Sequence, residues 1–240
     1  MLFRQLLDSE TSTFTYLLAD TDTGEAILID PVFEKVERDI LLLSELGLKL
    51  LYTIDTHVHA DHITGSGTLR ERLGAKTVIG TGAKIDCADI SAGHGALLHF
   101  GAHTAEIRHT PGHTSSCISI VVSEGDQTMV FTGDALFVRG CGRTDFQQGS
   151  PADLYRSVHG QIFTLDDNTL VYPGHDYKGH SVTTVAEEKA HNPRLNLTID
   201  EARFTSIMSG LNLAYPKKIK QSLPANLACG KVPTNPTPEA

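Results

Sequence analysis

Four side chains of types that bind metal ions lie within six residues of this sequence, in the run from His57 to His62. Alternate residues of an extended chain share a face, so His57 and His59 are expected to point the same way, and the following turn supplies Asp61 and His62. Burying three imidazoles and a carboxylate without partners is costly. A solvated loop explains any one of them, but the four together predict a metal site.

Three later segments repeat one arrangement, in which a predicted strand ends and a His or Asp follows. His113 and His175 each come after a Pro-Gly pair, and Asp134 comes after a glycine. Loops held by a rigid sheet are where catalytic groups usually sit. A lone His after a turn is more often a surface residue than a ligand. Together with the His57–His62 run, however, these residues predict one metal-binding constellation.

The hydrophobic pattern predicts strands and helices that interleave along the chain. Strands are expected at 13–18, 25–30, 50–55, 77–79, 105–109, 118–122, 129–132 and 170–172, the first two forming a hairpin. Helices are expected at 36–46, 69–73, 152–163, 182–189 and 199–208. This alternation favours a layered α/β architecture. The end of the chain, 232–238, is Pro-rich and is expected to be an extended or disordered tail.

The charge of the chain argues against two classes of partner. A net charge of -9 over 240 residues disfavours nucleic acid and anionic membranes, since both need a basic face. No apolar run approaches the roughly 20 residues that span a bilayer. The N-terminal residues do not resemble a signal peptide. A cytoplasmic protein is therefore expected.

The four cysteines are widely separated and form no CxxC pair. They are Cys87, Cys117, Cys141 and Cys229. In a chain of this size such scatter is no disulfide framework, so reduced thiols are expected. Cys141 lies between two glycines, and a structural role is favoured over a catalytic one.

The candidate ligands, in their order and approximate spacing, resemble the metallo-β-lactamase superfamily. They are His57, His59, Asp61, His62, His113, Asp134 and His175. The resemblance implies an α/β fold, the αββα sandwich, in which two mixed sheets lie face to face with helices outside and the metal at one edge. It covers residues 1–180 most clearly. The organisation expected is a single domain, 1–240, with 191–240 a C-terminal extension.

Several further segments look like one branch of that superfamily, the persulfide dioxygenases or sulfur dioxygenases. They are 139–149, 175–177, 192–195, 208–213, 216–219 and 224–230. The resemblance implies an oxidoreductase that converts glutathione persulfide (GSSH), O2 and water to sulfite and glutathione. It extends the match to nearly the whole chain.

Carried over by position, the resemblance implies one Fe(II) per chain, held by His57, His113 and Asp134. Two His and one carboxylate form the facial triad that suits non-haem Fe(II), because three coordination positions stay open for substrate sulfur and dioxygen. The other four candidates, His59, Asp61, His62 and His175, then become outer-shell residues or a second metal site.

Arg143 and Tyr177 are the candidates for binding the glutathione part of the substrate. A guanidinium holds a carboxylate by paired hydrogen bonds, and glutathione carries two carboxylates. The alternative for Arg143 is a structural salt bridge, and for Tyr177 it is packing. The oligomeric state is left open, with a homodimer among the alternatives.

A hydrolase of the glyoxalase II type is the second interpretation, because that enzyme uses all seven ligand residues to hold two metal ions. It would cleave S-D-lactoylglutathione and need no oxygen. Glyoxalase II also carries a helical substrate-binding region after its last ligand histidine, whereas here the dioxygenase-like segments occupy that place. A non-catalytic metal-binding protein is the third interpretation.

Overall fold

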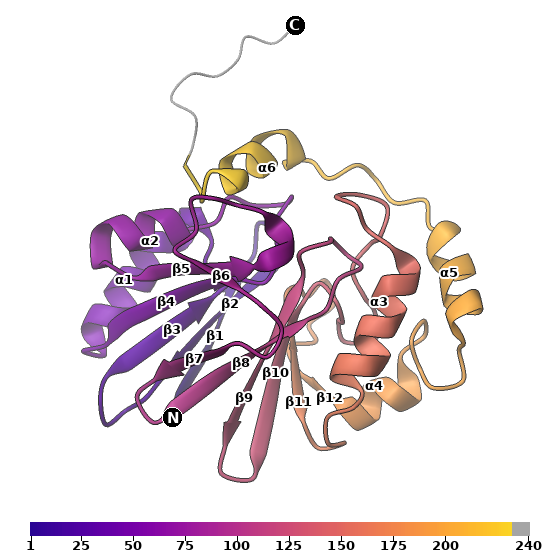
Figure 1. Ribbon diagram of the computed structural model, residues 1–240, viewed down its shortest axis with the longest axis horizontal. Coiled ribbons are helices and arrows are strands. Elements are labelled where there is room, and N and C mark those ends of the chain that lie inside the picture. Colours follow the sequence, from indigo (N-terminus) through magenta and orange to yellow (C-terminus); the bar gives the residue numbers. More distant parts are fainter. Residues whose placement is uncertain (232–240) are drawn as a thin grey trace, which may run out of the picture.

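Two six-stranded sheets lie face to face in the computed structural model, which describes residues 1–231 (Figure 1). The first sheet runs in chain order: β1 (Leu2–Asp8), β2 (Thr13–Ala19), β3 (Glu25–Ile29), β4 (Lys49–Asp55), β5 (Lys76–Gly80) and β6 (Ile90–Ala92). The second sheet also runs in chain order: β7 (Leu97–Phe100), β8 (His103–His109), β9 (Ile118–Glu124), β10 (Gln127–Gly133), β11 (Leu170–Pro173) and β12 (Thr183–Thr184).

Both sheets are mixed. In the first, β1, β2 and β3 pair antiparallel, and β3 through β6 pair parallel. In the second, β10 and β11 pair parallel and the other neighbours pair antiparallel. The expected fold class, two mixed sheets with helices outside, is confirmed.

Alternation along the strands builds the core between the sheets. In β2, Tyr16 and Leu18 face the opposite sheet while Leu17 packs toward the helices, as expected for a period of two residues. Phe131 of β10 faces Tyr16, with ring centroids 4.9 Å apart. The central strands are therefore buried on both faces, which explains their nearly continuous apolar sequence.

Helices cover the two outer faces of the sandwich (Figure 1). The first sheet carries α1 (Val36–Glu45) and α2 (Ser66–Leu73), and the second carries α3 (Pro151–Ser157), α4 (Val185–His191) and α5 (Glu201–Ser209). Short 3₁₀ turns span Phe33–Lys35 and Thr81–Ala83, and a π-helical turn, Val158–Ile162, continues α3. The chain then crosses back to α6 (Ile219–Leu227), near the end of the described residues.

None of the helices within residues 1–231 is long and apolar enough to cross a lipid bilayer.

Every strand and helix expected from the sequence is present, but some boundaries differ. The helix expected at 182–189 begins at Val185, because Thr183 pairs with Val171 as strand β12 and the Thr184 side chain caps the helix by accepting from the Glu187 N–H. The structure also contains elements that were not expected: β1, β6, β7, β12 and α6. The expected Pro-rich tail, 232–238, lies outside the described residues.

The expectation of four reduced cysteines is wrong for two of them. Cys87 and Cys229 form a disulfide although 142 positions separate them. Sequence spacing could not indicate this pair, because the path of the chain through α6 brings the two sulfurs together. Cys117 and Cys141 are free and buried. Burial raises the pKa of the Cys141 thiol to about 11, which agrees with a structural role.

One buried carboxylate of α1 has a consequence for stability. Asp39 is fully buried, and one of its oxygens has no hydrogen-bond partner within residues 1–231. Burial raises the pKa of Asp39 to about 6, although the Arg38 guanidinium, 2.8 Å away, opposes the shift. The carboxyl group ionises less readily in the folded chain than in the unfolded chain. Its ionisation therefore destabilises the fold as the pH rises through this range.

We expect Asp39→Asn to gain stability relative to the wild type as the pH rises from about 4 to about 7, by up to about 3 kcal/mol. Below the unfolded-state pKa both side chains are neutral and the gain should vanish. Urea unfolding at pH 4 and pH 7.5 measures the difference. Glu45→Gln, at an exposed position of the same helix, is the control. A difference that does not change with pH would contradict the prediction.

Candidate metal centre

The His-rich run lies in a loop, not in a strand. Strand β4 ends at Asp55, and residues 56–65 form an irregular connection to α2, called here the ligand loop. His57 and His59 were expected to point the same way because they would share a face of an extended strand, and this reason is wrong. The loop nevertheless brings their rings together, with centroids 4.2 Å apart, and His57, His59 and His62 are all buried.

The second sheet supplies the other candidates at the ends of its strands. His113 lies in the loop after β8, Asp134 directly follows β10, and His175 follows β11. Gly133 explains how β10 approaches the ligand loop so closely. Its φ is +48°, and a Cβ at this position would lie 2.5 Å from the Thr56 hydroxyl oxygen. A residue without a side chain is thus required where the two sheets meet.

His57, His113 and Asp134 come together as one group. Each offers a ligand atom, and these atoms all lie within 4.8 Å of one another. The His113 Nε2 lies 3.4 Å from an Asp134 carboxylate oxygen, and the rings of His57 and His113 are perpendicular with centroids 4.8 Å apart. Two imidazoles and a carboxylate in this arrangement are a donor set that fits a single transition-metal ion.

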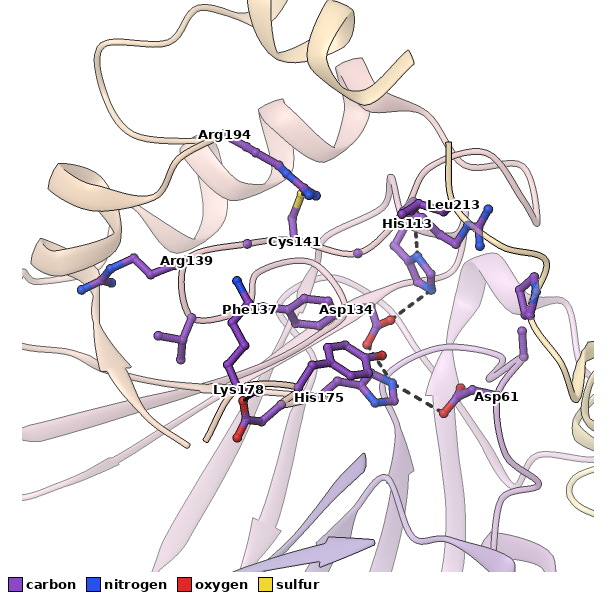
Figure 2. A pocket seen from close by; sticks show the side chains of 18 of the residues that line it. Asp61, His113, Asp134, Phe137, Arg139, Cys141, His175, Lys178, Arg194 and Leu213 are labelled. Atoms are coloured by element: carbon purple, nitrogen blue, oxygen red, sulfur yellow. Dashed lines mark hydrogen bonds and ion pairs between the residues drawn. The ribbon is translucent and has the colours of Figure 1, made fainter. Parts of the chain in front are cut away.

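His59, Asp61 and His62 form a second group, whose ligand atoms also all lie within 4.8 Å of one another. The Nδ1 of His59 and the Nε2 of His62 are buried without a hydrogen-bond partner within residues 1–231. Buried nitrogens are rarely left unpaired, so these atoms fit a further ligand, either a metal ion or water. His175 links the groups, because its Nε2 lies 3.6 Å from Asp61 and 3.5 Å from Asp134 (Figure 2).

Hydrogen bonds on the far side of each ring fix its orientation. The Nδ1 of His113 donates to the Arg143 carbonyl at 2.7 Å, and the Nδ1 of His175 donates to the Ser12 carbonyl at 3.2 Å. The Nε2 of His59 donates to Asp30 at 3.0 Å. Each bond occupies one ring nitrogen, so the other nitrogen can act as a ligand, which is the usual outer-shell arrangement around protein metals.

Burial and charge set the protonation of these rings differently. Burial holds the pKa of His57 well below its usual value, so this imidazole is neutral and its lone pair is available. Burial also acts to lower the pKa of His59, but the neighbouring Asp30 carboxylate raises it to about 9. Burial acts to raise the pKa of Asp61, yet His62 and His175 hold it well below its usual value.

A cavity of about 540 Å³ opens beside the candidate metal ligands (Figure 2). His113, Asp134 and His175 line it on one side. Apolar side chains form part of its wall: Phe137, Phe146, Tyr177, Leu213 and Pro216. Four cationic side chains also reach it: Arg139, Arg143, Lys178 and Arg194. This cavity can hold a molecule with an apolar part and anionic ends, next to the candidate ligands.

Comparison with known proteins supplies the family. A profile of the Metallo-beta-lactamase superfamily matches residues 9–175. The mouse protein named persulfide dioxygenase ETHE1, mitochondrial, is 52% identical over 233 residues, which cover 96% of this chain and 89% of that protein. The crystal structure of ETHE1 from Myxococcus xanthus superposes with a TM-score of 0.92 at 52% identity, covering 96% of this chain and all of that one.

The chain belongs to the persulfide dioxygenase family of the metallo-β-lactamase superfamily. The resemblance inferred from the sequence is thereby confirmed. A hydroxyacylglutathione hydrolase from Rhizobium meliloti is also similar, at 32% identity over 199 residues, covering 80% of this chain and 75% of that protein. The higher identity and coverage favour the persulfide dioxygenase family over the hydrolase.

The guanidinium of Arg143 is already hydrogen-bonded to other groups of this persulfide dioxygenase chain. Its Nε and one Nη donate to Asp145 at 2.6 and 2.7 Å, its other Nη donates to the Ala214 carbonyl at 2.7 Å, and its guanidinium lies over Phe146. These contacts agree with the structural alternative, and substrate binding by Arg143 stays a prediction. Tyr177 is 68% exposed, and its ring stacks on His175 at the cavity.

Two cations at the cavity, Arg194 and Lys178, were not among the expected site residues. Both line the cavity, and neither lies within salt-bridge distance of a carboxylate among residues 1–231. Figure 2 shows both side chains near the cavity, on the side away from Asp61. The segment containing Arg194 already looked like the persulfide dioxygenase branch. The sequence alone, however, does not distinguish these two cations from others at the cavity that have an ion-pair partner. Arg139 is one of these, since it contacts Glu187 and Glu188.

Asp134→Ala should remove most of the bound metal, because it deletes the only carboxylate of the His57, His113 and Asp134 group. Elemental analysis of protein purified under reducing conditions measures the metal per chain. The control is Asp167→Ala, which removes an exposed carboxylate paired with Lys189 and should leave the metal content unchanged. One full metal ion per chain in Asp134→Ala would count against the assignment.

Proposed function

We propose that this chain oxidises glutathione persulfide with O2 to sulfite and glutathione, using one Fe(II) held by His57, His113 and Asp134. The observation that carries the proposal is the grouping of these three donors, whose ligand atoms lie within 4.8 Å of one another. They lie beside a cavity lined by Arg194 and Lys178, which have no ion-pair partner among residues 1–231. Membership of the persulfide dioxygenase family makes the chain an enzyme, an oxidoreductase acting on a persulfide and oxygen.

The donor chemistry supports iron. Two imidazoles and one carboxylate are ligands of intermediate hardness, typical of non-haem Fe(II) enzymes that keep coordination positions open. When bound, the ferrous ion supplies the capacity to react with dioxygen, which no amino-acid side chain provides. His59, Asp61, His62 and His175 take outer positions in this assignment, where they orient the ligands and hold water.

The residues of the chain bind and orient the substrate. The persulfide enters as an anion, and its terminal sulfur is directed to the side of the cavity lined by His113 and Asp134. Arg194 and Lys178 are placed to receive a glutathione carboxylate, because neither cation has an ion-pair partner in the described chain. Tyr177 offers a hydroxyl at the cavity, and Arg143 binds a carboxylate if Asp145 gives up its contacts.

The apolar wall has a separate part in the reaction. Phe137 and Leu213 face the cavity near the donors and limit the access of water. Exclusion of water strengthens the attraction between the cations and the substrate anion. The peptide part of the substrate can also pack on these side chains. A binding site with a cationic region and an apolar wall suits a negatively charged tripeptide better than inorganic sulfide.

A hydroxyacylglutathione hydrolase with two metal ions is the second candidate. The unpaired nitrogens of His59 and His62 favour it, since a second ion would satisfy them. It shares the glutathione part of the substrate and differs in its need for oxygen. A cytoplasmic location and a homodimer also stay predictions from the sequence, and the name of the mouse relative assigns that protein to mitochondria.

Purified iron-loaded protein should consume oxygen when glutathione persulfide is added, and sulfite should form in equal amount. An oxygen electrode and sulfite assay measure both. The same preparation under nitrogen is tested for cleavage of S-D-lactoylglutathione, which should be negligible. Thioester cleavage without oxygen, together with two metal ions per chain, would replace the proposal with the hydrolase.

Arg194→Ala should raise the KM for glutathione persulfide by about 10- to 100-fold, because a desolvated charge-assisted hydrogen bond to a carboxylate is lost. The kcat should change much less, since Arg194 is not among the metal donors. Arg194→Lys should recover part of the loss. Arg156→Ala is the matched control, because Arg156 is exposed and pairs with Glu201 away from the cavity. An unchanged KM in Arg194→Ala would remove Arg194 from the binding site.

A further inference from the structure

One side chain of the C-terminal helix reaches the backbone of the ligand loop. Asn226 of α6 is buried, and its amide nitrogen donates to the carbonyls of His59 and His62, both at 2.8 Å. Its amide oxygen accepts from the Thr64 N–H at 2.9 Å. Both amide protons and the oxygen of this side chain are therefore used within the ligand loop.

These bonds matter because the ligand loop has no regular structure. Neighbouring segments pair only part of its backbone, such as the Thr56 and Ile63 carbonyls, which accept from the N–H groups of Ile118 and Phe33 at 2.8 Å. Unpaired buried carbonyls are costly. Asn226 provides partners for two of the carbonyls, one on each side of Asp61. It also fixes Thr64, whose hydroxyl donates to Asp55 at 2.7 Å. The segment between His59 and Thr64 is thus held at both ends by a residue far away in the sequence.

The packing of α6 leaves little freedom for this contact. A Cβ on Gly230 would lie 2.3 Å from the Thr64 carbonyl oxygen, and a Cβ on Gly67 would lie 2.1 Å from the Cys229 carbonyl oxygen. Gly230 also has a φ of +79°, which a residue with a side chain rarely adopts. The disulfide from Cys229 to Cys87 anchors the end of the helix. The backbone of this segment therefore lies directly against the ligand loop.

We propose that Asn226 is a positioning residue for the metal centre, which acts by holding the backbone of the ligand loop so that His57, Asp61 and the neighbouring imidazoles keep their geometry. Asn226 bonds to the backbone of His59 and His62 and not to their ring nitrogens, and it takes no part in the chemistry. The inference rests on the proposed function only through the assignment of this loop to metal binding.

Two substitutions separate hydrogen bonding from simple packing. Asn226→Ala removes all three hydrogen bonds and leaves a small cavity. Asn226→Asp keeps the shape and the acceptor for Thr64, but it places a carboxylate against the carbonyl oxygens of His59 and His62. If Asn226 only fills space, the Asp variant should behave like the wild type. If its amide protons hold the loop, the Asp variant should fail as the Ala variant does.

The matched control comes from the same helix. Ser222 lies four residues before Asn226 and is equally buried, but its hydroxyl has no hydrogen-bond partner within residues 1–231. Ser222→Ala therefore perturbs the packing of α6 without breaking a bond to the loop. Loss of an unpaired buried hydroxyl should be close to neutral for stability.

The experiment compares the four full-length holoproteins by two measurements. Retention of Fe(II) against a competing chelator should fall about 10- to 100-fold in both Asn226 variants, the usual effect of losing an outer-shell partner, and should not change in Ser222→Ala. Hydrogen–deuterium exchange should accelerate in peptides covering 57–65 and stay unchanged in β8 and β9. Neither measurement uses turnover, so a failure of the dioxygenase assignment would not affect this result.

Three outcomes would overturn the inference. The first is wild-type iron retention in Asn226→Asp. The second is loss of iron without faster exchange in the ligand loop. The third is global unfolding of the Asn226 variants, detected by circular dichroism, because it would show that the residue supports the whole fold rather than the loop.

Discussion

The carboxylate of Asp30 organises the edge of the sandwich where the metal donors meet. It accepts from the Thr56 N–H at 2.7 Å, from the Thr56 hydroxyl at 2.8 Å and from His59 at 3.0 Å. Thr56 in turn accepts from the Nδ1 of His57 at 3.0 Å. A single buried anion at the end of β3 thus fixes two imidazoles of the ligand loop. Without it, the polar groups that follow β4 would lack partners in a region closed to water.

This dependence explains why the site is formed by strand ends from both sheets. Asp30 holds the ligand loop against the first sheet, and Asn226 holds the same loop from the C-terminal helix. Gly133 lets β10 of the second sheet approach Thr56, which brings Asp134 to His57. The donors therefore keep their positions through contacts between distant segments. A loop held in this way can present several buried imidazoles without collapsing onto itself.

The sequence predicted the parts of this arrangement that depend on local pattern. The strand ends and the residue types after them identified His113, Asp134 and His175, because a His or Asp following a buried strand is a local feature. The same reasoning could not find Asp30, Asn226 or the Cys87–Cys229 disulfide, since each gains its role from a tertiary contact. For Arg143 the sequence left two alternatives, substrate binding and a structural salt bridge, and the first stays a prediction. A residue type suited to a substrate carboxylate is here paired with a carboxylate of the chain itself.

Because a persulfide dioxygenase and a hydrolase share the seven donors, the neighbours of those donors must separate the two reactions. Asp61 lies 3.0 Å from the Nδ1 of His62 and 3.6 Å from the Nε2 of His175. Burial acts to raise the pKa of Asp61, but these imidazoles hold it well below its usual value. Its negative charge is thus offset by the chain before any second cation arrives. Asp134 is placed similarly, because the Nε2 of His113 lies 3.4 Å and the Nε2 of His175 lies 3.5 Å from its carboxylate. His175 therefore joins the carboxylates of the two groups of donors, so a change at either carboxylate is expected to affect both groups.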